Sequence, residues 1–525
     1  MTGSGMRSRA SAALMLIVGV LLSGCSLTAT DERTDPPPSP TQTEFIQDLG
    51  DHAVLSDPVD ITVSEDTTGA HMRAQNIGIS LEATDLADER LDPEKSTLDD
   101  RLKELGTPAL RFGGNRLDRN LFWTSSDEPA PHDDAVVVGP DDLKRLKRLT
   151  DATGATVTLG VPLGDFDPER GADMAAHAQQ ILGDALVGVA IGNEPNGYTI
   201  DGEPNHRLRE DDWDTGEYLE QLEAYSDAIE EVAPGTPIVG PDVYDVEWMR
   251  AFAGADLPHT TALAQHWYAL YDCESDEVPG RGPRAENLVS TTVRDSAETV
   301  LGIGLSVAEE EDLPLWLEET GPTSCPGTND TSRTQAKALW TADFALEAAQ
   351  LGVERVAMHS MLGPCAGGAP MSVVCSREEG SAEIIGQNNH AAMRLAAMSA
   401  GGEFLEVDGA TEGMRVHAVQ RNEGDQIVVT LVNVLDAAEI DASPVSITVP
   451  QGFEATQASQ VTADDLTSAT SSDYQPALPL QAELPGATPG ATDEAGDDEH
   501  TIALDIDTSA ATVLVFERES RLRSD

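Results

Sequence analysis

The sequence predicts an α/β protein, a (β/α)8 barrel followed by a C-terminal β-sandwich. Three observations support this fold class. Between residues 76 and 359, eight short apolar runs alternate with segments of helical periodicity. The runs are apolar on both faces, as strands of a buried parallel sheet are. After about residue 386 the pattern changes to strands that alternate polar and apolar residues, which is typical of a sandwich.

The first 24 residues indicate an exported protein. Arg7 and Arg9 precede an apolar run at 13–22 that is too short to cross a bilayer as a mature helix. A Leu-Ser-Gly-Cys tetrapeptide then ends at Cys25 and resembles the lipobox of bacterial lipoproteins, whose cysteine is acylated. We therefore expect residues 1–24 to be a lipoprotein signal peptide, and Cys25 to anchor the protein extracytoplasmically to the bacterial cell membrane. An ordinary secretory signal with an incidental cysteine is the alternative.

Residues 25–58 have the composition of a linker. Pro36, Pro37, Pro38 and Pro40 lie among threonine, serine and aspartate, and nothing there can form a core. This predicts a disordered, Pro-rich tether. The next segment, 59–75, begins with the alternating run VDITVSE and is a candidate strand of the C-terminal sandwich.

Residues 76–385 are the predicted barrel domain. Eight βα units match a TIM barrel, which typically takes about 250 residues. A doubly wound sheet would need a glycine-rich phosphate loop after its first strand, and none follows Glu82. The expected strands are 76–82, 108–114, 156–164, 185–194, 237–244, 262–270, 314–321 and 355–362. The expected helices are 97–105, 140–152, 171–182, 215–232, 292–311 and 333–351.

Residues 386–525 are the predicted sandwich domain. A helix is expected at about 386–399, and an acidic loop rich in proline and glycine interrupts the strands at about 471–499. The expected strands are 414–421, 426–434, 444–450, 500–507 and 511–518.

Four cysteines remain once Cys25 is assigned to the anchor. An even number in an oxidising compartment predicts two disulfides, for which three pairings exist. We favour Cys273–Cys325 and Cys365–Cys375, because each pair would join loops on one face of the barrel. Metal binding is the weaker interpretation, because no CxxC or HxxxH spacing accompanies these cysteines, and no metal site is predicted.

The formal charge of −61 limits the possible partners. Nucleic acid is excluded as a partner, because its recognition needs clusters of lysine and arginine. The acidic residues are spread along the chain, which indicates a highly solvated surface. A polyanionic polymer would be repelled unless the cleft held a local basic patch, and the sequence shows none.

Polar side chains stand at the ends of six of the eight predicted barrel strands. The active site of such a barrel lies at the C-terminal ends of its strands, and polar groups in an apolar setting are costly unless they are used. They are Glu82 on the first strand, Arg111 and Asn115 on the second, Asn193 and Glu194 on the fourth, His266 and Tyr268 on the sixth, Glu318 and Glu319 on the seventh, and His359 on the eighth.

Two of these carboxyl groups have the placement that glycoside cleavage requires. That reaction uses one carboxyl as an acid and another as an ionised nucleophile, about 5–5.5 Å apart in retaining enzymes. The fourth and seventh strands lie across a narrow barrel, so Glu194 and Glu319 can meet this spacing.

Longer stretches around these residues resemble glycoside hydrolase family 79, a member of clan A that includes β-glucuronidases and heparanases. They are LRFGGNRLDRNLFW (110–123), VAIGNEPNGY (189–198), AQHWY (264–268) and the segment 317–360, and the resemblance runs from about residue 59 to the C-terminus.

The resemblance implies a role for each residue that matches the family pattern. Glu194, after Asn193, would be the acid/base, and Glu319, in Glu-Thr-Gly, the nucleophile. Asn193 would bond the sugar 2-hydroxyl, and His266 and Tyr268 match a His-x-Tyr pair whose tyrosine contacts the nucleophile and keeps it ionised. Arg111 or Asn115 would support the same carboxylate, and Glu82 is a further candidate for substrate binding, although a loop or capping carboxylate is the alternative.

The choice between Glu318 and Glu319 depends on strand geometry. Alternation along a strand sends adjacent side chains to opposite faces, so we expect only one of them to point into the barrel mouth. Trp316 and Glu318 would share one face, and Leu317 and Glu319 the other. The match to Glu-Thr-Gly favours Glu319. His266 has the alternative of being a hydrogen-bonded core histidine.

These observations predict a retaining glycoside hydrolase without a cofactor, acting by double displacement on β-linked sugars, with β-glucuronides favoured by the resemblance. The loop at 361–370, where the family binds the uronate carboxyl, holds no Tyr, Arg or Lys, although the amides of Gly367 and Gly368 can bind an anion. A β-xylosidase or β-glucosidase is one alternative, and a surface lipoprotein that binds glycans without cleaving them is another.

Overall fold

The computed structural model describes residues 58–126, 128–200, 206–271, 273–274, 278–436, 440, 442–468, 480–482, 488–489 and 499–518. The predicted signal peptide, Cys25 and the tether up to residue 57 lie outside these residues, as does most of the acidic loop at 471–499. Among the described residues, no helix is both long and apolar enough to cross a membrane.

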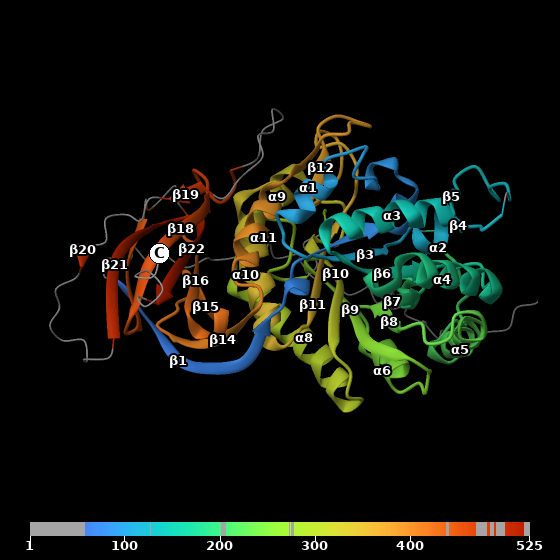
Figure 1. Ribbon diagram of the computed structural model, residues 1–525, viewed down its shortest axis with the longest axis horizontal. Coiled ribbons are helices and arrows are strands. Elements are labelled where there is room, and N and C mark those ends of the chain that lie inside the picture. Colours follow the sequence, from blue (N-terminus) through green and yellow to red (C-terminus); the bar gives the residue numbers. More distant parts are fainter. Residues whose placement is uncertain are drawn as a thin grey trace, which may run out of the picture. The chain divides into compact units, whose positions relative to one another are not determined.

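Eight parallel strands close into a barrel in the order β10-β11-β2-β3-β6-β7-β8-β9, which confirms the predicted fold class (Figure 1). Each lies where an apolar run predicted a strand, and closure rules out the doubly wound alternative. Their bounds are β2 Gly78–Glu82, β3 Ala109–Gly113, β6 Thr156–Val161, β7 Leu186–Ile191, β8 Ile238–Val243, β9 Thr260–Leu270, β10 Leu315–Thr323 and β11 Arg355–Ser360.

Helices surround the barrel, and all six predicted ones are present. α3 shows why the sequence specifies them, since Pro140 begins it and Gly154 ends it in the left-handed conformation. α6 was missed because eight residues give little helical periodicity to detect. The helices are α1 Leu98–Lys103, α2 Leu117–Asn120, α3 Pro140–Thr153, α4 Pro168–Leu182, α5 Thr215–Val232, α6 Val246–Ala253, α7 Ala285–Leu288, α8 Thr291–Glu310, α9 Asn329–Ser332 and α10 Gln335–Leu351.

The remaining strands build a second, mostly sheet domain. After α11 (Asn388–Ala397), one ten-stranded sheet has the order β19-β18-β22-β16-β15-β14-β1-β17-β21-β20. The sequence analysis did not predict four strands of this sheet, which are β14, β18 and the short β19 and β20. Bounds are β1 Val59–Met72, β14 Gly402–Asp408, β15 Met414–Arg421, β16 Gln426–Asn433, β17 Ala442–Pro450, β18 Phe453–Thr462, β19 Leu480–Ala482, β20 Thr488–Pro489, β21 Glu499–Asp507 and β22 Ala510–Arg518.

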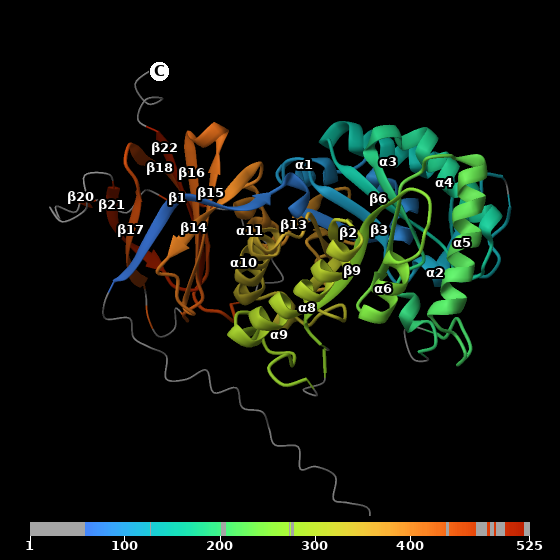
Figure 2. The same ribbon diagram turned by 90° about the horizontal axis from the view of Figure 1, so that it is seen from below.

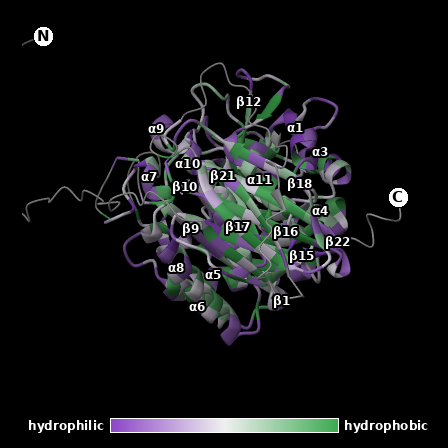
Figure 3. Ribbon diagram, turned by 90° about the vertical axis from the view of Figure 1, so that its left-hand side faces the viewer, coloured by the Kyte–Doolittle hydropathy of each residue, from purple (hydrophilic) through white to green (hydrophobic). Residues whose placement is uncertain are grey.

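β1 joins the two arms of this sheet. It pairs antiparallel with β14 and parallel with β17, with register shifts after Val63 and Thr67 (Figure 2). Side chains from both arms, such as Ile447 and Phe516, share one buried core. The sandwich is therefore one hydrogen-bonded sheet whose arms face each other, and Figure 3 shows hydrophobic and hydrophilic segments mixed along its strands.

α10 connects the barrel to the sheet domain, and nearly all its residues are buried. The Gln335 side chain donates to the carbonyls of Val461 (3.2 Å) and Ser509 (2.8 Å). Arg415 of β15 pairs with Asp343 of α10 at 2.6 Å. Two small two-stranded sheets complete the fold, β4 (Leu121–Trp123) with β5 (Val136–Val138) and β12 (Val374–Ser376) with β13 (Ile384–Gly386).

Candidate active site

Glu319 on β10 accepts two charge-assisted hydrogen bonds at the barrel mouth. The Tyr268 hydroxyl donates to Oε1 at 2.6 Å, and Arg111 donates to Oε2 at 2.5 Å. Burial alone would raise the pKa of the Glu319 carboxyl, but His359, His266, Arg111 and the Tyr268 hydroxyl together hold that pKa well below its ordinary value. Glu319 is therefore ionised at neutral pH, as a nucleophile must be.

Glu194 follows β7 and faces the same space. It adopts a left-handed conformation (φ 47°), which is uncommon for a residue other than glycine and costly unless its surroundings hold it. Its amide donates to the Asp242 carbonyl at 2.9 Å, and its Oε1 lies 3.0 Å from Nδ1 of His266. The Glu194 side chain is 20% exposed against 7% for Glu319, so it is the carboxyl that solvent reaches more easily.

The two carboxylates are close neighbours. One oxygen of Glu194, one of Glu319 and one ring nitrogen of His266 all lie within 4.8 Å of one another. This agrees with the roughly 5–5.5 Å spacing of retaining glycosidases and is shorter than the roughly 6.5–9.5 Å of inverting ones. These three side chains also offer the kinds of atom that bind metal ions, but the guanidinium of Arg111 already forms an ion pair with the Glu319 carboxylate.

Arg111 of β3 is the fully buried hub of the site. Besides Glu319 it donates to Ser80 Oγ (3.0 Å), Asn193 Oδ1 (2.7 Å) and Asp242 Oδ2 (2.8 Å). Burial opposes its charge, but Asp242 and Glu319 raise the pKa of the guanidinium above its ordinary value. Asp242, on β8, was missed by the sequence analysis, although an acidic residue inside the apolar run at 237–244 was a usable signal.

Asn193 lies beside this hub with one donor unused. Its Oδ1 accepts from Arg111 and from the Gly114 amide at 3.0 Å. Its Nδ2 is buried and makes no hydrogen bond within the described part of the chain. A buried donor without a partner is costly, so this amide group is available to bind a substrate oxygen.

His266 and Glu82 have strongly shifted pKa values. Burial would lower the pKa of His266, but Glu319, Asp242 and Glu194 raise it to about 9, so the imidazole is protonated at neutral pH.

Burial, and then the charge of Glu319, raises the pKa of the Glu82 carboxyl to about 8. Glu82 accepts from the Arg116 amide at 3.1 Å and lies 3.8 Å from His359. A neutral Glu82 can donate a hydrogen bond at the mouth.

The structure differs from two expectations about individual residues. Asn115 is partly exposed in the loop after β3, and its side chain makes no hydrogen bond to the described residues, so of these two candidates Arg111 is the one that supports Glu319. The expectation that Glu319 shares a face with Leu317, opposite to Trp316 and Glu318, is wrong. Both glutamates are buried inside the barrel, because β10 contains one extra residue between Leu317 and Thr320 relative to β9 and β11.

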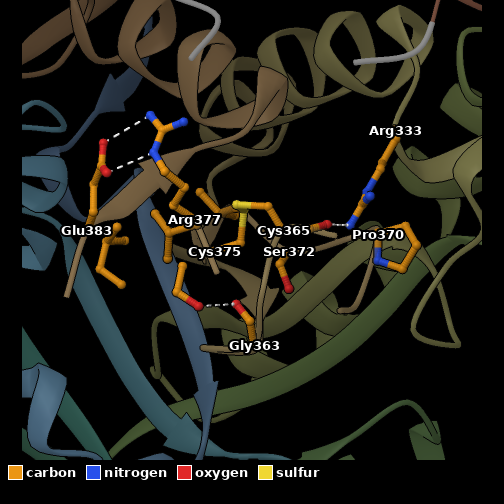
Figure 4. The surroundings of a disulfide bond; sticks show 12 residues. Arg333, Gly363, Cys365, Pro370, Ser372, Cys375, Arg377 and Glu383 are labelled. Atoms are coloured by element: carbon orange, nitrogen blue, oxygen red, sulfur yellow. Dashed lines mark hydrogen bonds and ion pairs between the residues drawn. A yellow bond between two sulfur atoms is a disulfide. The ribbon is translucent and has the colours of Figure 1, made fainter. Parts of the chain in front are cut away.

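Both favoured disulfides are present, Cys273–Cys325 and Cys365–Cys375. The second closes the loop after β11 (Figure 4). Arg333 donates to the Cys365 carbonyl from outside this loop, and buried Lys337 donates to the Pro370 carbonyl at 3.1 Å. The side chains of Arg333 and Lys337 therefore hold the loop backbone, although the loop itself contains no lysine or arginine.

No family profile and no curated protein sequence matches this chain. Solved structures share its fold. A 4-O-α-L-rhamnosyl-β-D-glucuronidase from Fusarium oxysporum 12S has a TM-score of 0.64 at 17% identity, over 86% of this chain and 99% of the other. A family 51 arabinofuranosidase from Xanthomonas axonopodis pv. citri has a TM-score of 0.60 at 14% identity (88% and 100%). A glucosidase from Croceicoccus marinus has 0.55 at 13% identity (88% and 99%).

Proposed function

We propose that this protein is a retaining glycoside hydrolase that works by double displacement, with Glu319 as nucleophile and Glu194 as acid/base. The observation that carries the proposal is the pair of carboxylates within 4.8 Å of each other at the barrel mouth. Arg111 and Tyr268 keep one of them ionised, and the other is the more exposed. The fold that it shares with solved glycosidases agrees with this proposal.

The geometry suits both steps of the reaction. Glu319 attacks the anomeric carbon while Glu194 protonates the leaving oxygen, and water then hydrolyses the glycosyl-enzyme with Glu194 as base. The protonated imidazole of His266, 3.0 Å from Glu194 and close to Asp242, orients the acid/base. The free Nδ2 of Asn193 is placed to bond the sugar 2-hydroxyl, a contact that strengthens in the transition state.

We propose a β-glucuronide or a related β-glycoside as substrate. The resemblance to family 79 and the shared fold of a rhamnosyl-β-D-glucuronidase support a uronate sugar. The loop after β11 offers backbone amides rather than side-chain cations, and Gly367 has a φ of 83° there. Half-exposed Tyr244 and Tyr271, at the ends of β8 and β9, offer apolar surface for the rest of the substrate.

Nitrophenol release from a panel of aryl glycosides tests the proposal. The panel contains β-glucuronide, α-L-arabinofuranoside, β-xyloside and β-glucoside, and we expect the β-glucuronide to give the highest kcat/KM. A preference for the xyloside or glucoside would reassign the substrate within the same chemistry. A folded protein that binds sugars in calorimetry but turns over none of the panel would instead be a glycan-binding protein.

We also propose that the protein is exported and anchored through Cys25, since the first 25 residues carry this signal. Globomycin-sensitive processing and metabolic labelling with a fatty-acid analogue test the anchor. Loss of the label in Cys25→Ala is expected, and a secreted, unlabelled wild-type protein would favour the ordinary signal peptide.

A further inference from the structure

A second buried ion pair lies inside the barrel, beneath the catalytic carboxylates. Glu318 is fully buried, and its Oε1 lies 2.7 Å from Nε of Arg355, which is 2% exposed. Arg355 also donates to Thr156 Oγ1 at 2.8 Å and to the Leu110 carbonyl at 2.9 Å, so it spans the barrel from β11 to β3 and β6. Nothing in the proposed reaction uses either residue.

The bulge in β10 explains why Glu318 lies there. Leu317 pairs with Gln265 of β9, yet Glu319 already pairs with the next residue, His266. Trp316 faces the barrel interior, where it packs against Val239, Ala262 and Ala264. Ordinary alternation brings Glu318 to the same side, and the extra residue turns Glu319 inward as well.

From this geometry we propose that Glu318 and Arg355 are positioning residues, which hold the bulge that presents Glu319 and balance the charge beneath it. The proposal rests on the proposed function only for the role of Glu319. An unpaired carboxylate inside the barrel would be strongly disfavoured. Arg355 supplies the counter-charge that allows the bulge to place Glu318 there.

The charged groups around Glu318 come from four strands, its own β10 included. It faces Arg355 on β11, Arg111 on β3 and Asp242 on β8, and Glu319 lies beside it on β10, while the uncharged Thr158 of β6 is a further neighbour. Burial raises the pKa of Glu318 and lowers that of Arg355, and each residue opposes the effect of burial on the other. Arg111 in turn pairs with both Glu319 and Asp242, and Asp242 lies 3.7 Å from His266, which gives a route from this pair to the site.

The test measures the pKa of His266 by NMR of protein labelled with ¹³C-histidine, with the signal assigned from its loss in His266→Asn. Glu318→Gln leaves the Arg355 guanidinium uncompensated, and this charge disfavours the imidazolium. We expect the pKa of His266 to fall by roughly one unit. Glu318→Gln/Arg355→Met should return it to within about 0.2 units of the wild-type value. The alkaline limb of kcat/KM should move in the same direction as the His266 pKa.

Two variants separate charge balance from simple loosening of the barrel. Arg355→Met also breaks the pair but leaves no positive charge, so the pKa of His266 should not fall, whereas water entering a loosened site would lower it in both single variants. Asp343→Asn is the matched control, because it breaks another buried ion pair, at the sheet-domain interface. It should leave the pKa of His266 unchanged.

An unchanged His266 pKa in Glu318→Gln, or an equal fall in Arg355→Met or Asp343→Asn, would overturn the proposal. If Glu318→Gln does not fold, a fall in Arg355→Met still overturns it, and an unchanged or raised value supports it. The NMR result stands whether or not any sugar is hydrolysed, so it fails independently of the proposed function.

Discussion

At the scale of single residues, the two carboxylates that we propose as catalytic differ in what surrounds them. Arg111 and Tyr268 donate to Glu319, whereas Glu194 has the imidazole of His266 and access to solvent. In the proposed mechanism, these different surroundings suit one carboxyl to the nucleophile role and the other to the acid/base role. Paired carboxyls in enzymes generally divide these roles through their surroundings.

Alanine variants test these roles directly. Glu319→Ala should lower kcat at least ~10⁴-fold, with azide restoring turnover as the α-azide of a β-glycoside. Glu194→Ala should lose roughly 10²–10⁴-fold, less for substrates with good leaving groups, and azide should then give the β-azide. Product stereochemistry by NMR is the measurement. Retained activity in Glu319→Ala together with loss in Glu318→Ala would reverse our assignment of the nucleophile.

Tyr268→Phe tests how the nucleophile is kept ionised. The hydroxyl stabilises the charged form of Glu319, so its removal should raise the pKa of that carboxyl and move the acidic limb of kcat/KM to higher pH. We expect a tenfold to hundredfold loss, roughly the value of a hydrogen bond to a charged group, and a larger loss at pH 5 than at pH 7. Tyr225→Phe is the control, because the Tyr225 hydroxyl bonds the Pro162 carbonyl away from these carboxylates. An unchanged acidic limb in Tyr268→Phe would show that the hydroxyl does not set the ionisation.

Glu82→Gln tests the raised pKa of Glu82. Below about pH 8 the wild-type carboxyl is neutral, and above it a second negative charge appears near Glu319. The glutamine variant is neutral at all pH values, so its kcat/KM at pH 6 should stay within about tenfold of wild type while the inflection near pH 8 disappears. Glu82→Ala, which removes the donor, should lose more at pH 6. Persistence of the inflection in Glu82→Gln would assign it to another group.

At the scale of elements, one extra residue in β10 decides which side chains enter the mouth. Strict alternation would have turned Glu319 away from the mouth, and the bulge lets both glutamates face inward. Nothing in LWLEETG marks a bulge by itself, so the sequence pointed to Glu319 as nucleophile candidate through resemblance, and to a wrong facing through periodicity.

The loop after β11 offers a prediction at the same scale. Cys365 and Cys375 close a short loop between β11 and β12, and Arg377 pairs with Glu383 beside it (Figure 4). Cys365→Ser/Cys375→Ser should lower the free energy of unfolding by roughly 2–3 kcal/mol through added chain entropy. It should also raise KM more than it lowers kcat, because the loop borders the mouth. Denaturant unfolding and steady-state kinetics are the measurements, and an unchanged KM would exclude the loop from substrate binding.

At the scale of the whole molecule, α10 and β15 meet in a buried charge network. Asp343 accepts from Arg415 at 2.6 Å and lies 2.9 Å from His417 and 3.3 Å from Arg294. Burial would raise the pKa of Asp343, but Arg415, the hydrogen bond with His417 and Arg294 hold it well below its ordinary value. A carboxyl with a lowered pKa stabilises the fold above its unfolded-state pKa, near 3.9, and loses that contribution as pH falls through the lower folded value.

Asp343→Asn should therefore lower the free energy of unfolding by about 3–5 kcal/mol at pH 7, because it leaves buried cations unpaired. The difference from wild type should shrink as the pH is lowered below 4. Urea unfolding at pH 7 and pH 3 measures this, with Glu354→Gln, the partner of partly exposed Arg73, as the control. An equal destabilisation at both pH values would show that the charge of Asp343 is not the cause.

The amino-acid sequence by itself determined the eight barrel strands, because buried parallel strands carry continuous apolar runs whose spacing needs no tertiary information. It also predicted the two disulfides, and it identified polar side chains at the ends of six barrel strands but missed Asp242 on β8. Tertiary structure decided the rest. The register of β10 against β9 turned both glutamates inward, barrel closure brought Arg111 to four partners from four strands, and β1 reached the far sheet between β14 and β17. These features depend on pairings between distant segments, which local periodicity does not encode.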